Sequence, residues 1–406
     1  MKYIIILIDG AGDYAIESLG NKTPLEMAKT PFMDELAQRG EIGLVKTIPN
    51  GMQPGSDVAN LAVMGYAPEK YHTGRSPLEA ASMGVPLTDT DTTFRCNLVT
   101  LTEEENYSEK TILDHSAGDI TTEEATQLIL DIRESLQSDS ILFYPGVSYR
   151  HLILWKEGPY DFDLTAPHDI LTKTITEYLP KGPHKNLIYN MMEKSYNLLI
   201  DHPINIARKK RGLNPANSIW IWGEGKKPRL DSFYDKFHLK GSVISAVDLI
   251  NGIGILAGLH PIKIEGATGT IHTNFDGKGK AAVDSLLNGD DFVYLHLEAP
   301  DECGHQGDLD GKIKSLEIID EKIIGVIKNA MEKAKEDYRI MVLPDHMTPI
   351  TLRTHTSDPV PYMIFDSSSN TQTENRFTEK MGKASEIFFE NGPSLVDYFI
   401  NKYPKR

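Results

Sequence analysis

The sequence predicts an α/β protein with a largely parallel central sheet flanked by helices, and a smaller α+β unit inserted into it. Short β-branched runs that end in turns alternate with longer stretches whose apolar residues recur at helical spacing. A polar, loop-rich middle interrupts this alternation. A chain of 406 residues also exceeds the usual size of one hydrophobic core, which favours two domains.

The predicted strands are short apolar blocks that polar residues follow closely. The first block ends at Asp9-Gly10, and two later blocks are followed by Asp301 and by Asp345-His346. Such blocks are typical of strands buried in a parallel sheet, where ligands bind at the carboxyl ends of the strands. The predicted strands cover residues 2–8, 291–298, 339–343 and 361–366, and helices are expected over 245–259 and 313–335.

The middle of the chain has a different character from the rest. A helix is expected over 122–136, behind a cap at Thr121, and strands over 141–144 and 149–155. These elements fit a small α+β unit that closes over a cleft. We therefore expect a core domain formed by residues 1–90 and 218–406, and an inserted substrate-binding cap domain over 91–217.

Composition narrows the classes of partner. The chain has 58 acidic and 42 basic residues and a formal net charge of −16, which disfavours binding to nucleic acid or anionic membranes. Metal ions and a few arginines can still reverse the field inside one cleft, so a small anionic metabolite remains possible. Two cysteines are too few for a disulfide framework, the opening apolar run is too short for a signal peptide, and we expect a cytoplasmic protein.

Carboxylate and imidazole groups gather after the predicted strands. Asp301 and His305 are four residues apart, and His355 follows Asp345-His346. Each residue alone is more often a surface or capping residue, but the joint pattern is specific. Carboxylates crowded together without a cation would have sharply raised pKa values, whereas divalent ions stabilise the same cluster. The candidate metal ligands of this cluster are Asp9, Asp301, His305, Asp345, His346 and His355.

Ser56 is the candidate nucleophile. It lies in a glycine turn, Pro54-Gly55-Ser56, and is followed by an apolar run of helical character. A serine at a helix start is usually an N-cap. A helix N-terminus also favours phosphate, and a metal-bound serine oxygen there would be an activated nucleophile. The local sequence allows both interpretations, and a site of two metals would favour the second.

Several contiguous motifs are similar to those of the alkaline phosphatase superfamily, and specifically of the archaeal-type cofactor-independent phosphoglycerate mutases. The resemblance extends over nearly the whole chain. The motifs are Asp9-Gly-Ala-Gly-Asp13, Gly55-Ser-Asp-Val-Ala-Asn-Leu-Ala62, Thr73-Gly-Arg75-Ser-Pro-Leu-Glu79, Phe94-Arg-Cys-Asn97, Glu298-Ala-Pro-Asp-Glu302 with Gly304-His305, and Asp345-His346.

This resemblance implies an alkaline-phosphatase-like core with an inserted cap, and a phosphoserine at Ser56. The implied activity is the interconversion of 3-phosphoglycerate and 2-phosphoglycerate without 2,3-bisphosphoglycerate. It also implies two divalent ions, Mn, Zn or Co. One would lie near Asp9, Ser56, Asp345 and His346, and the other near Asp301, His305 and His355.

Substrate contacts are expected from arginines, because a guanidinium group forms bidentate pairs with phosphate and carboxylate. The candidates are Arg75, Arg95 and Arg150, with His72 nearby in sequence. Each arginine could instead be a surface salt-bridge partner.

One segment departs from the family pattern. The archaeal-type mutases carry Asp-Arg-Arg-Ala-Gly-Arg where this chain has Asp114-His-Ser-Ala-Gly-Asp119. This altered form resembles a subgroup proposed as homoserine kinases, so phosphotransfer to homoserine is the alternative activity. A phosphomonoester hydrolase and a binding protein that kept only the fold are further alternatives.

Overall fold

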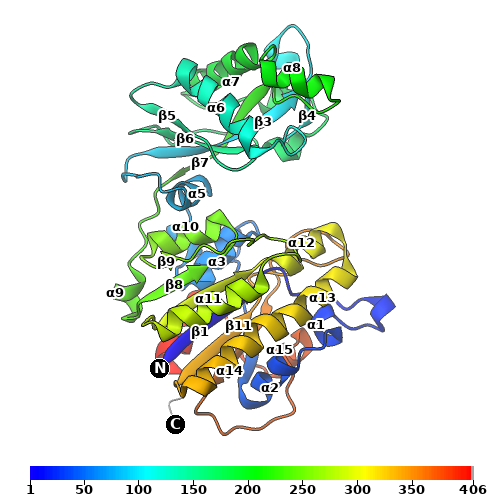
Figure 1. Cartoon of the computed structure of the whole chain (residues 1–406), viewed down its shortest axis with the longest axis vertical. Helices are drawn as coiled ribbons and strands as arrows, with labels where there is room; N and C mark the ends of the chain where they lie inside the picture. Colours follow the sequence, from blue (N-terminus) through cyan, green and yellow to red (C-terminus); the bar gives the residue numbers. More distant parts are fainter. Residues whose placement is uncertain (404–406) are drawn as a thin grey trace. The chain divides into compact units, whose positions relative to one another are not determined.

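The computed structural model describes residues 1–403 and contains two compact units. The first unit is formed by residues 1–72 together with the chain from 229 onward, and the second by residues 73–228. Figure 1 shows the elements of both units, coloured along the sequence. Each unit combines helices with a sheet, and the predicted α/β class is confirmed.

The second unit is longer at both ends than the cap domain expected over 91–217. Helix α5 (Ser76–Ser82) packs on β3 (Thr92–Leu101), and β7 (Ser218–Lys226) pairs with β3 along most of its length. Both flanking segments therefore belong with the middle of the chain. The pairing of β3 with β7 joins residues far apart in sequence, and no local pattern indicates it.

The first unit is built on one mixed sheet in which most neighbouring strands run parallel. All four predicted strands are confirmed, with small shifts in their bounds. In spatial order the strands are β13 (Phe388–Phe389), β2 (Glu41–Val45), β12 (Val360–Asp366), β11 (Tyr338–Leu343), β1 (Lys2–Ile8), β10 (Phe292–Leu297), β8 (Gly241–Ile244) and β9 (His260–Pro261).

Strand β1 lies between β10 and β11 and pairs in parallel with both, so that Leu7 stands beside His296 and Leu343. The carboxyl ends of these three strands therefore meet at one edge of the sheet. Strand β12 runs antiparallel to β11 and to β2, and it ends at the opposite edge. The segments that follow β1, β10 and β11 carry the candidate metal ligands.

Helices cover the sheet of the first unit (Figure 1). Ile4, Ile6 and Ile8 of β1 share a core with residues of α2, α11, α13 and α14. Helix α3 contacts Tyr294, which alternates with the residues of that core along β10. The helices are α1 (Pro24–Met27), α2 (Pro31–Arg39), α3 (Ser56–Val63), α4 (Pro68–Tyr71), α9 (Phe233–Phe237), α10 (Asp248–Leu256), α11 (Phe275–Leu287), α12 (Ala299–Gln306), α13 (Leu309–Ile319), α14 (Gly325–Ala334), α15 (Glu379–Ala384) and α16 (Gly392–Asp397).

The helix expected over 313–335 is interrupted in the structure. A π-helical turn, Asp320–Ile324, separates α13 from α14. Asp320 in this turn accepts hydrogen bonds from the N–H groups of Phe32 (3.1 Å) and Met33 (2.7 Å) at the start of α2. The interruption thus coincides with a contact to a distant helix, which apolar periodicity does not reveal. The helix expected over 245–259 is present as the shorter α10.

The second unit is an α+β structure with its own apolar core. Helix α6 has the predicted bounds, Thr122–Leu136, and the Thr121 hydroxyl accepts from the N–H of Glu124 at 3.3 Å. In residues 1–403 no helix has both the length and the apolar character needed to span a membrane. The remaining elements of the second unit are β4 (Ile112–Asp114), β5 (Ile141–Tyr144), β6 (Arg150–Trp155), α7 (Lys185–Leu199) and α8 (Pro203–Lys210).

Candidate metal centre and its serine

Asp9 follows β1 and is buried, with 1% of its surface exposed. Its Oδ2 lies 2.9 Å from Nε2 of His296, while Oδ1 has no hydrogen-bond partner within residues 1–403. Burial, and then the neighbouring carboxylates of Asp345 and Asp301, raise the pKa of Asp9 well above its ordinary value. A buried carboxylate oxygen without a donor is costly, and it fits a cation that the protein is built to hold.

Asp345 and His346 follow β11, at the same sheet edge. Asp345 Oδ1 accepts from the N–H groups of His346 (2.8 Å) and Gly10 (3.2 Å), and Oδ2 accepts from Asn60 Nδ2 at 3.0 Å. Gly10 has φ +62°, and a Cβ there would lie 2.5 Å from Asp301 Oδ1. Glycine is therefore required where the loop after β1 passes this site.

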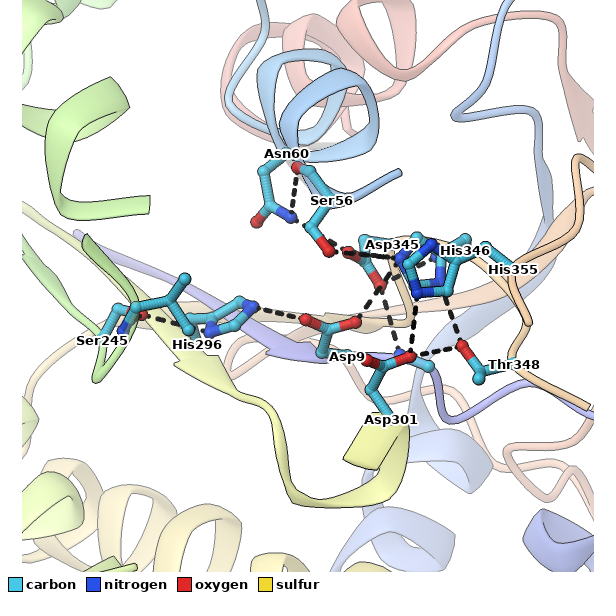
Figure 2. A network of polar contacts seen from close by, with 12 residues as sticks. Asp9, Ser56, Asn60, Ser245, His296, Asp301, Asp345, His346, Thr348 and His355 are labelled. Atoms are coloured by element: carbon cyan, nitrogen blue, oxygen red, sulfur yellow. Dashed lines mark hydrogen bonds and ion pairs between the residues drawn. The ribbon is translucent and has the colours of Figure 1, made fainter. Parts of the chain in front are cut away.

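Three oxygen atoms surround Nε2 of His346, as Figure 2 shows. Ser56 Oγ lies at 3.3 Å, Asp345 Oδ2 at 3.4 Å and Asp9 Oδ1 at 3.6 Å. Ligand atoms that bind one tetrahedral cation at about 2.1 Å stand about 3.4 Å apart. The spacing is thus that of groups converging on a common ion.

The tautomer of His346 is set by Thr348. The Thr348 hydroxyl donates to Asp301 Oδ1, so its oxygen is left to accept from Nδ1–H of His346, 3.3 Å away. Nε2 then keeps its lone pair and faces the three oxygens. Burial lowers the pKa of His346, which also favours the neutral ring that binds metal.

A second group of side chains forms around Asp301, which belongs to α12. Its Oδ2 lies 3.3 Å from His305 Nε2, and its Oδ1 lies 3.5 Å from His355 Nε2. The two Nε2 atoms are 2.9 Å apart. Burial would raise the pKa of Asp301, but hydrogen bonds from His305 and His355 outweigh it and hold the pKa well below its ordinary value.

His305 is also oriented to bind a cation through Nε2. Its Nδ1 lies 3.0 Å from the carbonyl oxygen of Arg353, to which it donates. The hydrogen bond to Asp301 raises the pKa of His305 to about 9. A cation bound at Nε2 would therefore have to displace a proton, as is usual for metal binding to imidazole.

Ser56 is the first residue of α3, and Gly55 is the N-cap residue. Ser56 is therefore not the N-cap residue of this helix. Its Oγ instead lies next to His346, so the N-cap interpretation fails and the hydroxyl meets the candidate ligands. Asn60, one helical turn later, donates to both the Ser56 carbonyl oxygen (2.9 Å) and Asp345.

The structure thus brings together Ser56 and all six candidate metal ligands. Asp9, Asp345 and His346 form one set whose ligand atoms lie within 4.8 Å of one another, and Asp301, His346 and His355 form another. Carboxylate and imidazole donors, with the unpartnered Oδ1 of Asp9, fit divalent transition metals. Cys303 is also buried.

The predicted substrate-binding residues are divided between the units. His72, in the first unit, contacts Asp57, the neighbour of Ser56, through Nε2 and Oδ2 at 2.8 Å. Arg95 pairs with Glu79 at 3.1 Å, and its guanidinium lies 4.3 Å from the ring centre of Trp222. The three arginines, Arg75, Arg95 and Arg150, all belong to the second unit.

Two histidines that the sequence analysis did not identify accompany these arginines. His168 packs edge-on against Trp222 at 5.3 Å, and the rings of His168 and His115 are 6.2 Å apart. Burial lowers the pKa of His168, and Arg95 and Arg75 add to this effect. Cationic and aromatic side chains therefore gather in one part of the second unit.

The segment that departs from the family pattern has a structural role at its first residue. Asp114 accepts from the N–H groups of Ser116 (2.8 Å) and Gly118 (2.7 Å) and from Asn214 Nδ2 (2.8 Å). These hydrogen bonds outweigh the effect of burial and lower its pKa. Asp114 therefore shapes its own loop.

His296, Asn60 and Thr348 are functional candidates that sequence reasoning missed. His296 has one detectable feature, an imidazole inside an otherwise apolar strand. Asn60 and Thr348 carry common polar side chains, and only their tertiary contacts distinguish them.

A family model and curated relatives of this chain indicate the same family. The model of the 2,3-bisphosphoglycerate-independent phosphoglycerate mutase family matches residues 37–205. A probable enzyme of this kind from Geobacter sulfurreducens is 47% identical, with 99% of this chain and 100% of the relative covered. The enzyme of this kind from Methanothrix thermoacetophila is 45% identical, with 98% and 100% covered.

Solved structures show the same fold. A protein from Pyrococcus horikoshii superposes with a TM-score of 0.82 at 28% identity, covering 100% of this chain and 98% of the other. The cofactor-independent phosphoglycerate mutase from Thermoplasma acidophilum has the same fold, with a TM-score of 0.65 at 24% identity and coverage of 98% and 99%. The chain belongs to the family of 2,3-bisphosphoglycerate-independent phosphoglycerate mutases.

Proposed function

We propose that this chain is a metal-dependent phosphoglycerate mutase that interconverts 3-phosphoglycerate and 2-phosphoglycerate through a phosphoserine at Ser56. The observation that carries the proposal is the position of Ser56 Oγ, 3.3 Å from His346 Nε2 among the oxygens of Asp9 and Asp345. A metal ion held by these ligands would place cationic charge next to the hydroxyl, where an attacking oxygen gains most from it.

Two divalent cations are the proposed cofactors, with Mn²⁺, Zn²⁺ and Co²⁺ as candidates. Asp9, Ser56, Asp345 and His346 would hold one, and Asp301, His305 and His355 the other. When bound, such ions neutralise phosphoryl oxygens and favour the deprotonated serine. Metal identity follows availability as much as ligand type, because these donors accept several transition metals.

The chemistry assigned to Ser56 is a reversible transfer. The Ser56 hydroxyl loses its proton as Oγ forms a bond to phosphorus, the bond from phosphorus to the 3-oxygen of glycerate breaks, and that oxygen takes up a proton. The 2-hydroxyl of the retained glycerate then attacks the phosphoserine, loses its proton and releases Ser56. Asn60 holds Ser56 in a fixed position relative to Asp345, because it donates to both residues and accepts from Tyr294 Oη at 2.6 Å.

The proposed substrate contacts are His72, Arg75, Arg95 and Arg150. Phosphate and carboxylate both call for guanidinium donors of fixed geometry. Arg95 suits this role because Glu79 and Trp222 hold its side chain in one orientation. The proposed partner is accordingly a small phosphorylated metabolite, and with only two cysteines in the chain we place the reaction in the cytoplasm.

The test measures conversion of 3-phosphoglycerate by the purified chain with Mn²⁺ and without 2,3-bisphosphoglycerate. Phosphorus NMR monitors the reaction. Ser56→Ala should lower turnover by more than about 10⁴-fold, because it removes the nucleophile. Ser232→Ala is the matched control, since Ser232 is an N-cap serine that accepts from Asp235 N–H. It should cost about 1 kcal/mol of stability and leave turnover unchanged.

Further arms of this experiment separate the alternatives. Acid quenching during turnover should trap phosphate on the peptide that contains Ser56. Phosphorylation of homoserine by ATP, or release of inorganic phosphate as the main product, would replace the mutase assignment with a kinase or a hydrolase. Full mutase activity in Ser56→Ala would exclude the covalent route.

A further inference from the structure

His296 is a buried imidazole beside the candidate metal centre that belongs to neither set of proposed ligands. It lies in β10, is 0% exposed, and approaches Asp9 Oδ2 through Nε2 at 2.9 Å. Figure 2 shows Asp9 between His296 on one side and the group of Asp345 and His346 on the other. A polar ring in an apolar strand needs an account beyond packing.

Ser245 determines which nitrogen of this ring carries the proton. The Ser245 oxygen accepts from the N–H of Val247 at 2.9 Å, so its own hydrogen is free to be donated. The acceptor is Nδ1 of His296, 3.2 Å away. In the neutral ring the proton then resides on Nε2, which donates it to Asp9.

This hydrogen bond divides the two oxygens of Asp9 between separate tasks. Oδ2 is occupied by His296, whereas Oδ1 has no hydrogen-bond partner within residues 1–403 and lies 3.6 Å from His346 Nε2. Rotation of the carboxylate about its last bond would break the contact with His296. Asp9 is therefore held with a single oxygen directed at the candidate cation position.

We propose that His296, oriented by Ser245, is a positioning residue that makes Asp9 a one-oxygen metal ligand and strengthens metal binding. The inference rests on the proposed function, because it takes Asp9 as a ligand. Groups that hydrogen-bond to metal ligands fix their orientation, and their loss typically weakens metal binding about 10- to 100-fold.

The test measures binding of Mn²⁺ alone to the metal-free chain by calorimetry, together with thermal unfolding of the metal-free protein. Asp9→Asn identifies the binding step that belongs to this position. His296→Leu should raise the Kd of that step about 10- to 100-fold. His296→Gln, whose amide can still donate to Asp9, should restore most of the affinity. Ser245→Ala should cost about fivefold, the equivalent of one hydrogen bond.

His151 supplies the matched control. It is likewise a buried strand histidine, 4% exposed, with burial lowering its pKa to about 3, and its Nδ1 accepts from Gly146 N–H at 3.0 Å. His151→Leu lies in the second unit and should leave the Kd for Mn²⁺ unchanged, whatever it does to the unfolding temperature.

The outcomes distinguish an error in the proposed metal site from an error in the proposed role of His296. If the unmodified chain binds no Mn²⁺, or if Asp9→Asn changes no binding step, the proposed metal site itself is wrong. If Asp9→Asn weakens binding but His296→Leu and Ser245→Ala do not, His296 is only a packing residue. Should His296→Leu fail to fold, the comparison of Ser245→Ala and His296→Gln with the unmodified chain decides the inference in the same way.

Discussion

Lys312 and Asp13 form a buried ion pair beneath the candidate metal centre, and its removal gives a prediction with a definite size. Both side chains are 0% exposed, and Lys312 Nζ donates to Asp13 Oδ2 at 2.7 Å. Nζ also donates to the carbonyl oxygens of Thr348 (2.9 Å) and Gly12 (3.3 Å). The pair thus joins the loop after β1 to the loop after β11.

Lys312→Met approximately keeps the length of the side chain. It leaves the Asp13 carboxylate buried, with the N–H groups of Ile350 (3.1 Å) and Tyr14 (2.8 Å) as its remaining donors within residues 1–403. Removing one partner of a buried pair costs about 3–5 kcal/mol. At about 2–4 °C per kcal/mol for a unit of this size, the unfolding temperature should fall by roughly 10 °C.

Thermal unfolding followed by circular dichroism, with EDTA present, is the assay. Lys280→Met is the control, because Lys280 and Asp284 form an exposed pair on α11 whose loss should cost less than about 1 kcal/mol. The double variant with Lys312→Met and Asp13→Asn should lose less stability than the sum of the two single losses, because the unpaired buried charge is then removed. The assignment of this pair as a stabilising buried ion pair would be refuted if Lys312→Met lost no more stability than Lys280→Met. It would also be refuted if the losses of the two single variants added strictly in the double variant.

Three other outcomes test separate parts of the structure. Burial raises the pKa of Glu379 from its ordinary value of 4.5 to about 7. The stability linked to its proton is therefore fully present below pH 4.5 and is lost as the pH rises through about 7, so Glu379→Gln should flatten the fall in unfolding temperature over this window. Mn²⁺ at about 100 times its Kd should stabilise the chain in chemical unfolding by about 2.7 kcal/mol for each site that it fills, and Asp345→Asn should abolish the gain that belongs to its own site. Arg95→Met should raise the KM for 3-phosphoglycerate about tenfold in steady-state kinetics, because a charge-assisted hydrogen bond to the substrate is lost. Mn²⁺ affinity should stay unchanged, because the candidate metal ligands all belong to the first unit.

Much of the first unit was predictable because short stretches of sequence determine its strands. A β-branched block that ends at Asp9 identifies both a buried strand and the edge where its ligand lies. The same reasoning located Asp345 and His346 after β11. Strand bounds followed from short-range pattern, and the ligands followed from the rule that parallel strands present their carboxyl ends together.

The features that could not be predicted depend on contacts between segments that are distant in the sequence. The pairing of β3 with β7 moved the unit boundary, and Asp320 bonded to the start of α2 within a π-helical turn. The Lys312–Asp13 pair joins residues 299 positions apart. Lysine and aspartate are ordinarily surface residues, so a sequence offers no reason to bury these two.

The charge balance of the candidate site explains how an acidic chain can take an anionic substrate. Asp9, Asp301 and Asp345 are at most 5% exposed. Two buried ammonium groups of the first unit have other partners, since Lys312 donates to Asp13 and Lys278 Nζ lies 3.4 Å from the carbonyl oxygen of His296. Buried carboxylates in such numbers need compensating charge. Two divalent cations would offset the negative charge of these three carboxylates, so the metal-loaded site would accept a phosphate ester while the surface of the chain stays negative.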